Sequence, residues 1–197
     1  MVRANHAREG LWQPAYRVLD KDGTFELREY DAAYAARIVI EDSRATATRD
    51  GFNALYQYIS GNNKDGHRYD MTAPVLQSTN AGPQYLEAVL AEDFNAVQSW
   101  TLTFHLPPKI GIERASPPLD ARVDLVELPA GRVAVQSFSG AWSDRNFQSA
   151  AQEVENKMAA RGVQLSETLL IAFCDAPQVP PALRHTEIHM PLKGGKL

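Results

Sequence analysis

Residues 51–75 read GFNALYQYISGNNKDGHRYDMTAPV, and this stretch carries the clearest signal for the fold. Its apolar and aromatic start predicts a helix that begins near Ser43 and ends at Gly61. A polar loop follows. The segment Met71-Thr72-Ala73-Pro74-Val75 then opens a strand, because proline restricts the backbone at a strand entry. The stretch therefore predicts a helix, a turn, a loop and a strand in succession.

The predicted helix has two stripes that serve different purposes. Residues three and four apart share one side of a helix. Leu55 and Ile59 form one stripe, which we assign to the core against a sheet. The neighbouring column is Arg49, Phe52 and Tyr56. This column is left as the candidate ligand face, in a groove beside the helix.

Alternation predicts a strand over residues 100–106. Its apolar face carries Leu102, Phe104 and Leu106. Its other face carries Thr101, Thr103 and His105. We expect the apolar face to be buried and His105 to face solvent. The continuous apolar run over residues 169–173 predicts a central strand.

A second helix is marked at both ends. Ser143 or Asp144 can cap its start, because a short polar side chain accepts hydrogen bonds from free backbone amides. Gly162 supplies an end. Between them, apolar residues recur at helical spacing: Phe147, Ala151, Val154 and Met158.

A faint internal repeat relates residues 27–36 to residues 125–134. Each copy is a strand, a tight turn and a second strand, followed by a helix with a phenylalanine near its start. The sequence therefore predicts an α+β fold: a distorted, nearly closed antiparallel β-barrel of two pseudo-twofold β-β-α-β repeats with two flanking α-helices. Residues 13–192 are expected to form a single domain, with flexible tails at 1–12 and 193–197.

The length, charge and cysteine content of the chain exclude several classes of protein. A chain of 197 residues with 44% hydrophobic content suits one domain with a sizeable core. The net charge of −4 argues against a nucleic-acid binder, which usually carries a basic excess. The single Cys174 excludes an internal disulfide and suits a reducing compartment. No run approaches the ~20 apolar residues of a membrane span, and the first ten residues are no signal peptide. We expect a cytoplasmic protein.

Four segments in order resemble one known family. They are the motif of residues 51–75, the opening strands of residues 14–30, the central segment of residues 104–140 and the closing strand of residues 183–192. Each motif is weak alone. Together they resemble the SOUL haem-binding protein family over nearly the whole chain.

The resemblance implies a haem or related tetrapyrrole ligand, which binds in a groove beside the first helix. Contacts in the family align with Arg49, Phe52 and Tyr56. The physical match is direct, because aromatic rings suit an apolar disc and a guanidinium can grip a carboxylate in two-pronged fashion. The ordinary alternative is that Phe52 and Tyr56 are core residues and Arg49 is a solvated helix charge.

The iron ligand is not fixed by the resemblance. Some members carry a histidine where this chain has Glu29, and a carboxylate is a poor substitute on haem iron. His67, in the loop after the first helix, is the best alternative iron ligand, unless it is simply solvated. His185 and His189 lie on the closing strand and could border the groove. Other members bind haem with no protein ligand.

The predicted function is a haem-binding protein that carries, buffers or delivers its ligand. A small-molecule effector-binding module of the regulator type, or an enzyme acting on a porphyrin, are the alternatives. No catalytic residue is predicted: no nucleophile elbow, P-loop or GxGxxG is present. Cys174 is expected to be an inert thiol. Glu26, Glu29 and Asp31 are expected at a solvated strand edge, and the sequence names no protein partner.

Overall fold

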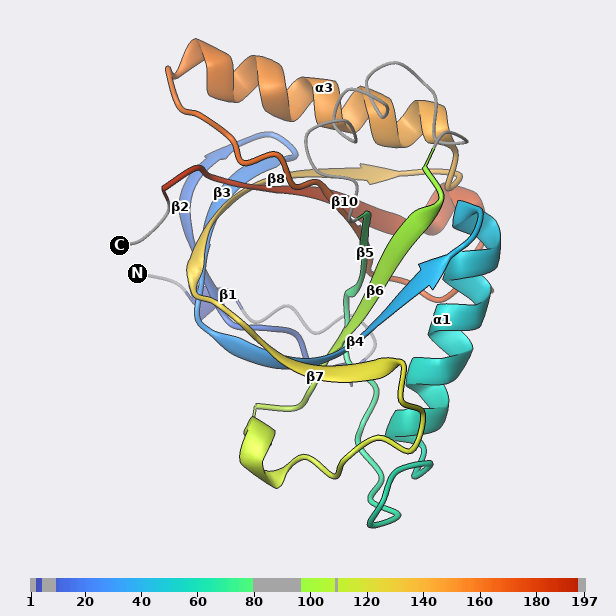
Figure 1. Ribbon diagram of the computed structural model, residues 1–197. Helices are drawn as coiled ribbons and strands as arrows, with labels where there is room; N and C mark the ends of the chain where they lie inside the picture. Colours follow the sequence, from blue (N-terminus) through green and yellow to red (C-terminus); the bar gives the residue numbers. More distant parts are fainter. Residues whose placement is uncertain (1–2, 5–9, 80–96, 109, 195–197) are drawn as a thin grey trace.

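The computed structural model describes residues 3–4, 10–79, 97–108 and 110–194 (Figure 1). The strands are β1 (Arg3–Ala4), β2 (Tyr16–Asp22), β3 (Phe25–Tyr30), β4 (Ala33–Glu41), β5 (Val75–Thr79), β6 (Ser99–His105), β7 (Val123–Leu128), β8 (Gly131–Ser139), β9 (Leu170–Phe173) and β10 (His185–Pro191). The helices are α1 (Arg44–Ile59) and α3 (Asp144–Ala160), with short 3₁₀ turns η3 (Ile112–Arg114) and η4 (Pro181–Leu183).

All ten strands belong to one antiparallel sheet in the order β1-β2-β3-β8-β10-β9-β5-β6-β4-β7. The sheet curls, and the two helices lie outside the curl (Figure 1). The predicted α+β class and antiparallel sheet are confirmed. The predicted near-closure is corrected, because β1 and β7 are edges that do not pair with each other among the described strands.

The two halves of the sheet are joined at two short connections. After β3 the chain continues into β4 within two residues, and after β7 it continues into β8 within two residues. At both crossings the halves are joined by the chain itself rather than by a ladder of hydrogen bonds. Pro129, between β7 and β8, has no N–H to donate to such a ladder.

The strand order is symmetric about its β5–β9 pair. Outward from that pair lie β6, β4 and β7 on one side and β10, β8 and β3 on the other. α1 follows β4, and α3 follows β8. This order is what a twofold relation requires, and the pseudo-twofold repeat itself stays a prediction.

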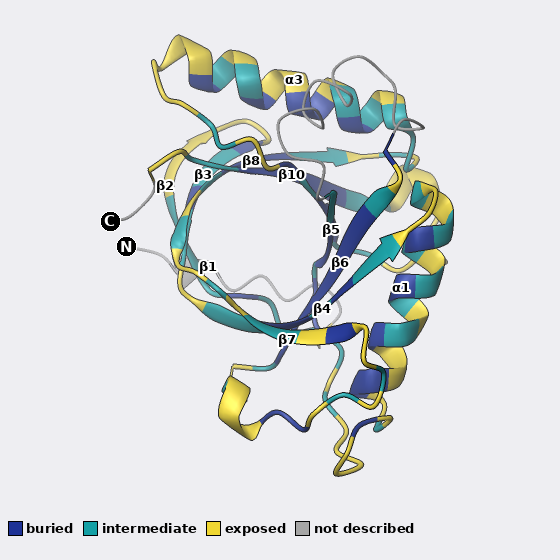
Figure 2. Cartoon of the chain, viewed as in Figure 1, coloured by how far each residue is buried: buried dark blue, intermediate teal, exposed yellow. Residues whose placement is uncertain are grey.

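The helices form where the sequence predicts them. The side chain of Ser43 accepts from the backbone of Thr46 at the start of α1, and that of Ser143 accepts from Asn146 at the start of α3. The residues assigned to the core are buried: Leu55, Ile59, Phe147, Ala151, Val154 and Met158. Figure 2 shows the buried sides of both helices turned toward the sheet.

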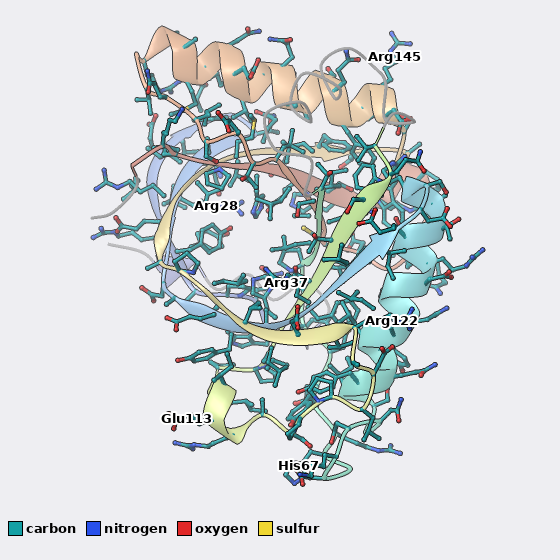
Figure 3. The ribbon with its side chains drawn as sticks, viewed as in Figure 1. Arg28, Arg37, His67, Glu113, Arg122 and Arg145 are labelled. Carbon is teal, nitrogen blue, oxygen red and sulfur yellow. The ribbon has the colours of Figure 1, made fainter. Side chains whose placement is uncertain are left out.

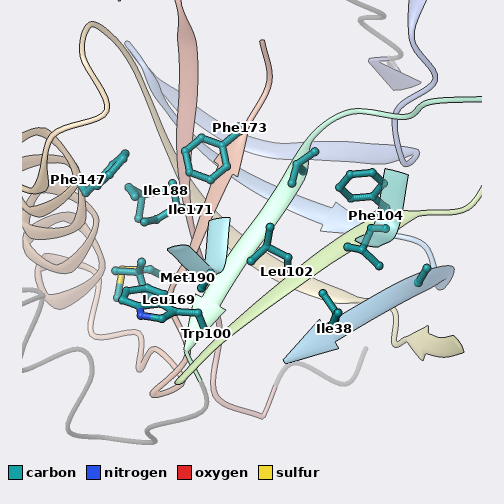
Figure 4. Packing of buried hydrophobic residues seen from close by; sticks show 14 of the residues in the cluster. Ile38, Trp100, Leu102, Phe104, Phe147, Leu169, Ile171, Phe173, Ile188 and Met190 are labelled. Atoms are coloured by element: carbon teal, nitrogen blue, oxygen red, sulfur yellow. The ribbon is translucent and has the colours of Figure 1, made fainter. Parts of the chain in front are cut away.

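The outer face of the sheet is apolar and packs against these helices. The ring of Phe104 in β6 lies 5.2 Å from that of Phe52 in α1, edge to face. On the other half, the rings of Phe138 in β8 and Phe147 in α3 lie 6.0 Å apart. Figure 4 shows this layer of buried apolar side chains. The predicted apolar face of residues 100–106 is confirmed.

The opposite face of β6 does not meet solvent, so the expectation for His105 is wrong. Thr101, Thr103 and His105 are all buried. They point to the inside of the curl, where the sheet covers its own polar face. Alternation identified the two faces correctly but could not show that both are enclosed.

In the described part of the chain, no helix is long and apolar enough to cross a membrane. Much of the predicted flexible tails, at residues 1–2, 5–9 and 195–197, lies outside the described residues.

α1 approaches the sheet closely at Gly51. A Cβ at this position would lie 3.1 Å from Leu102 Cδ1 and 3.3 Å from Ile38 Cγ2. We therefore expect Gly51→Val to lower the free energy of unfolding by about 1–3 kcal/mol through overpacking. Urea unfolding measures the effect. Ala45→Val, at an exposed position of the same helix, is the matched control. Equal loss in both variants would contradict the packing argument.

Candidate functional site

Two strands send charged and aromatic side chains into the curl. Because successive strand residues alternate between faces, β3 presents Glu26, Arg28 and Tyr30 together, and β10 presents His185, Glu187 and His189. Figure 3 labels Arg28 inside the ring of strands. These six residues, which we call the inner polar cluster, come from opposite ends of the sequence.

The centre of the inner polar cluster is an ion pair. Arg28 Nη1 donates to Glu187 Oε2 at 2.9 Å, and Nη2 donates to Oε1 at 2.8 Å. Both residues are only 5% exposed. Arg28 also donates from Nε to Glu26 Oε2 at 2.8 Å and from Nη1 to the Tyr30 hydroxyl at 3.1 Å. Such a two-pronged arrangement is the strongest geometry for this pair of groups.

Two imidazoles complete the bonding of the Glu187 carboxylate. His185 Nε2 lies 3.1 Å from Oε1, and His189 Nε2 lies 2.7 Å from Oε2. The Ser137 hydroxyl adds a contact of 3.3 Å to Oε1. Burial by itself raises the pKa of Glu187, but the bonds from His185 and His189 and the charge of Arg28 outweigh it and hold this pKa well below its usual range. Glu187 is therefore a carboxylate.

Two cavities adjoin the inner polar cluster. The larger has a volume of about 800 Å³, and the smaller has about 300 Å³. Pro14, Tyr30 and Pro74 line both. The larger is walled mainly by apolar side chains, among them Leu76, Leu128, Val133, Leu170 and Leu192, with His105 and His189. The smaller is walled mainly by polar and aromatic residues, among them Tyr16, Lys21, Glu26, Arg28, Cys174 and Glu187.

His105 contributes a neutral imidazole to the larger cavity. Burial lowers the pKa of His105 to about 4, a bond with the backbone of Pro74 opposes the shift, and His189 adds to it. The Nδ1 atom of His105 is buried without a hydrogen-bond partner. The backbone carbonyl of His105 accepts from the Thr72 hydroxyl at 2.7 Å, which ties the MTAPV segment to the end of β6.

The predicted ligand face on α1 lies outside the curl and lines neither of these two cavities. The rings of Phe52 and Tyr56 are stacked, 5.9 Å apart and 10° from parallel. Phe52 is partly buried, whereas Tyr56 is 50% exposed. Arg49 is exposed, and its Nε donates to Asp50 Oδ1 at 2.7 Å. Tyr56 and Arg49 are thus not core residues, and the face remains a prediction as a binding site.

The candidate iron ligands occupy different places. His67 is exposed in the loop after α1, where its backbone amide donates to Asn63 Oδ1 at 2.9 Å. Glu29 is bound by Arg17 and, at 3.4 Å, by Arg132. His185 and His189 border the inner cavities instead of α1.

The expected solvated edge is confirmed for Asp31, which is exposed, and corrected for Glu26 and Glu29. The side chains of Glu26 and Glu29 are only 14% and 10% exposed, because arginine and lysine partners cover them. The sequence signal that was missed is the alternation Glu26-x-Arg28-x-Tyr30 and His185-x-Glu187-x-His189. Opposite charges at matching phase in two strands can meet only if the sheet brings those strands together.

One subset of side chains has metal-ligand chemistry. Ligand atoms of Cys174, His185 and Glu187 lie within 4.8 Å of one another. Arg28 already neutralises Glu187, so a cation there would compete with a buried guanidinium. Cys174 Sγ lies 3.7 Å from the carbonyl oxygen of Ala172 at the wall of the smaller cavity.

The chain is similar to known proteins in sequence and in fold. The sequence matches the family described as "SOUL heme-binding protein" over residues 11–191. A search of curated proteins finds no match.

Solved structures share the fold at low identity. A hydrolase from Listeria innocua is 13% identical with a TM-score of 0.60, covering 86% of this chain and 92% of its own. The EcmrR C-terminal domain is 11% identical with a TM-score of 0.63, covering 90% and 98%. At such identity these likenesses show the fold alone.

Breaking the central ion pair tests its energetic role. We expect Arg28→Met to cost about 3–5 kcal/mol of unfolding free energy, because it leaves the Glu187 charge buried without its main partner. The double variant Arg28→Met/Glu187→Met should be closer to wild type than the single one. Chemical denaturation of the three proteins measures this. A double variant less stable than Arg28→Met would refute the desolvation account.

The buried imidazole predicts a pH effect on stability. An unfolded histidine titrates near pH 6.5, whereas folded His105 has a pKa of about 4. Between these values the unfolded chain binds more protons, so the free energy of unfolding falls as the pH falls. One proton corresponds to at most about 1.4 kcal/mol per pH unit.

Denaturation curves between pH 4 and pH 7 check this expectation. His105→Leu should show a shallower loss of stability than wild type across that window. His67→Gln, which alters an exposed ring, should retain the wild-type slope. Identical slopes in all three proteins would show that His105 does not carry the effect.

Proposed function

The chain belongs to the SOUL heme-binding protein family, and on that premise we propose that it binds haem or a related tetrapyrrole reversibly. Its role is to carry, buffer or deliver this ligand. The observation that supports the proposal most is the family match over residues 11–191, together with a stacked aromatic pair on α1 of which Tyr56 is exposed.

The proposed contacts on α1 are Arg49, Phe52 and Tyr56. A flat macrocycle laid on the Tyr56 ring would cover the half of that residue now in solvent. Each Å² of apolar surface removed from water contributes roughly 25 cal/mol before the cost of association. Phe52 supports Tyr56 from below by stacking and is itself fixed against Phe104.

Arg49 can hold an acidic edge of the ligand. Its Nε bonds Asp50, and no other partner of its guanidinium is recorded among the described residues. The two Nη groups can therefore bind a propionate in two-pronged fashion. His67 is the proposed iron ligand at this face, since Glu29 is occupied by two arginines.

This face is open on one side, and that openness suits reversible binding. A ligand held by one aromatic surface and one ion pair exposes its other face to water. Its dissociation is then fast, because most affinity differences arise in the rate of release. A carrier or buffer needs such exchange.

A second candidate is an effector-binding module of the regulator type. The observation that favours it is the cavity of about 800 Å³ inside the curl, which lies within the roughly 300–1,000 Å³ of small-molecule sites. A thermal-shift screen separates the two functions. A ligand unrelated to porphyrins that stabilises the protein more than haemin does would favour the effector module.

A haemin titration followed in the Soret region tests the proposed function. We expect saturable binding by wild type and at least about tenfold weaker binding at the outer site for Arg49→Ala/Phe52→Ala, through lost stacking and charge. Asn53→Ala, at an exposed position of the same helix, is the control. Unchanged affinity in the double variant would remove the α1 face from the proposal. Absence of saturable binding by wild type would remove the function.

A further inference from the structure

We infer that the larger inner cavity is a second tetrapyrrole site, inside the curl of the sheet, in which His189 binds the iron. This inference rests on the proposed function and adds a site that the resemblance does not indicate. Three features of the cavity correspond to the three chemical parts of a haem: its apolar disc, its iron and its carboxylates.

The disc is matched by the size and polarity of the cavity. The volume of about 800 Å³ is near the upper end of the range for ligand pockets. Leucine side chains from four separate segments, including Leu76 and Leu170, form its walls. A disc between these walls is covered on more than one side, so more of its apolar surface leaves water than on the open face of α1.

The iron is matched by an imidazole that the fold holds in place. His189 is 6% exposed and lines the cavity. Its Nε2 lies 2.7 Å from Oε2 of the Glu187 carboxylate, which can only accept, so Nε2 carries the proton. In a ring that carries only this proton, the lone pair is on Nδ1, the atom that would bind the iron. Metal-binding histidines commonly donate their other N–H to a carboxylate in this way.

The position of the His189 ring is fixed from a second side. The Tyr30 ring lies 5.9 Å from it, centroid to centroid, on the neighbouring wall. Glu187 is in turn held by both Nη groups of Arg28. His105 lines the same cavity, but its Nδ1 is covered by protein atoms and so is the weaker candidate.

The carboxylates are matched at the rim. Arg132 lines the edge of the cavity, and its side chain, 45% exposed, turns to Glu29 on the outer face of the sheet. The propionates would therefore extend past this edge into water, where they need no buried partner. Arg28 and Glu187 neutralise each other, so the ligand need not supply a charge to balance them.

The experiment compares haemin with iron-free protoporphyrin IX in parallel titrations. Wild type should show a tight phase and a weaker phase for haemin. Leu170→Trp, which fills the cavity, should weaken the tight phase for both porphyrins at least about tenfold. Val133→Trp is a second filling variant, in case the first fails to fold, and thermal unfolding checks both. Arg49→Ala/Phe52→Ala is the matched outer-face variant and should affect only the weak phase.

The iron ligand has its own readout. His189→Ala should weaken haemin by about 10–100-fold and shift its Soret band, while protoporphyrin IX affinity stays within about threefold of wild type. Added imidazole should restore the wild-type Soret position in this variant. His67→Ala should leave the Soret band of the tight phase unchanged.

The outcomes separate this inference from the proposed function. If wild type binds haemin but folded filling variants retain the tight phase, the inner site is refuted and the function stands. If His189→Ala keeps the wild-type Soret band, or imidazole has no effect on it, the iron assignment is refuted. If wild type binds neither porphyrin, both proposals fall.

Discussion

The ion pair of Arg28 and Glu187 is the constraint on which the inside of this protein depends. Isolated charges cannot stay in such a place, because taking each one out of water costs several kcal/mol. The pair is tolerated because the two Nη groups of one guanidinium, two imidazoles and one hydroxyl saturate the carboxylate. β3 and β10 both flank β8, so the bond spans two strand spacings across the concave side of the sheet. It therefore favours curvature as well as register.

The two faces of the sheet carry different kinds of residue and have different roles. The outer face carries the large apolar side chains that pack on α1 and α3, and these contacts supply most of the burial. The inner face carries threonines, histidines and paired charges around two cavities. Because the helices stabilise the sheet from outside, the inside need not be filled. The cavity of about 800 Å³ lacks packing contacts, and the apolar packing on the outer face offsets that loss.

Sequence patterns predicted what depends on neighbouring residues. The serine caps, the buried stripes of both helices and the apolar face of residues 100–106 all follow from local spacing. The contacts inside the sheet could not be predicted, because they depend on how the sheet curves. Arg28 and Glu187 are 159 positions apart, and a charged residue on a strand is ordinarily solvated. The expectation for His105 is wrong for the same reason: alternation assigns a residue to a face, but only the curl of the sheet shows what that face meets. The outer site residues came from family resemblance.

The larger cavity lies where the two halves of the sheet meet. The chain crosses between halves at Asp31–Ala32 and at Pro129–Ala130, and residues from both crossings line the cavity. The ladders stop on either side of these crossings, at Tyr30 opposite Gly131 and at Ala33 opposite Leu128. Two short connections in place of a continuous ladder therefore form this wall of the larger cavity, whereas the pair of Arg28 and Glu187 lines the smaller one.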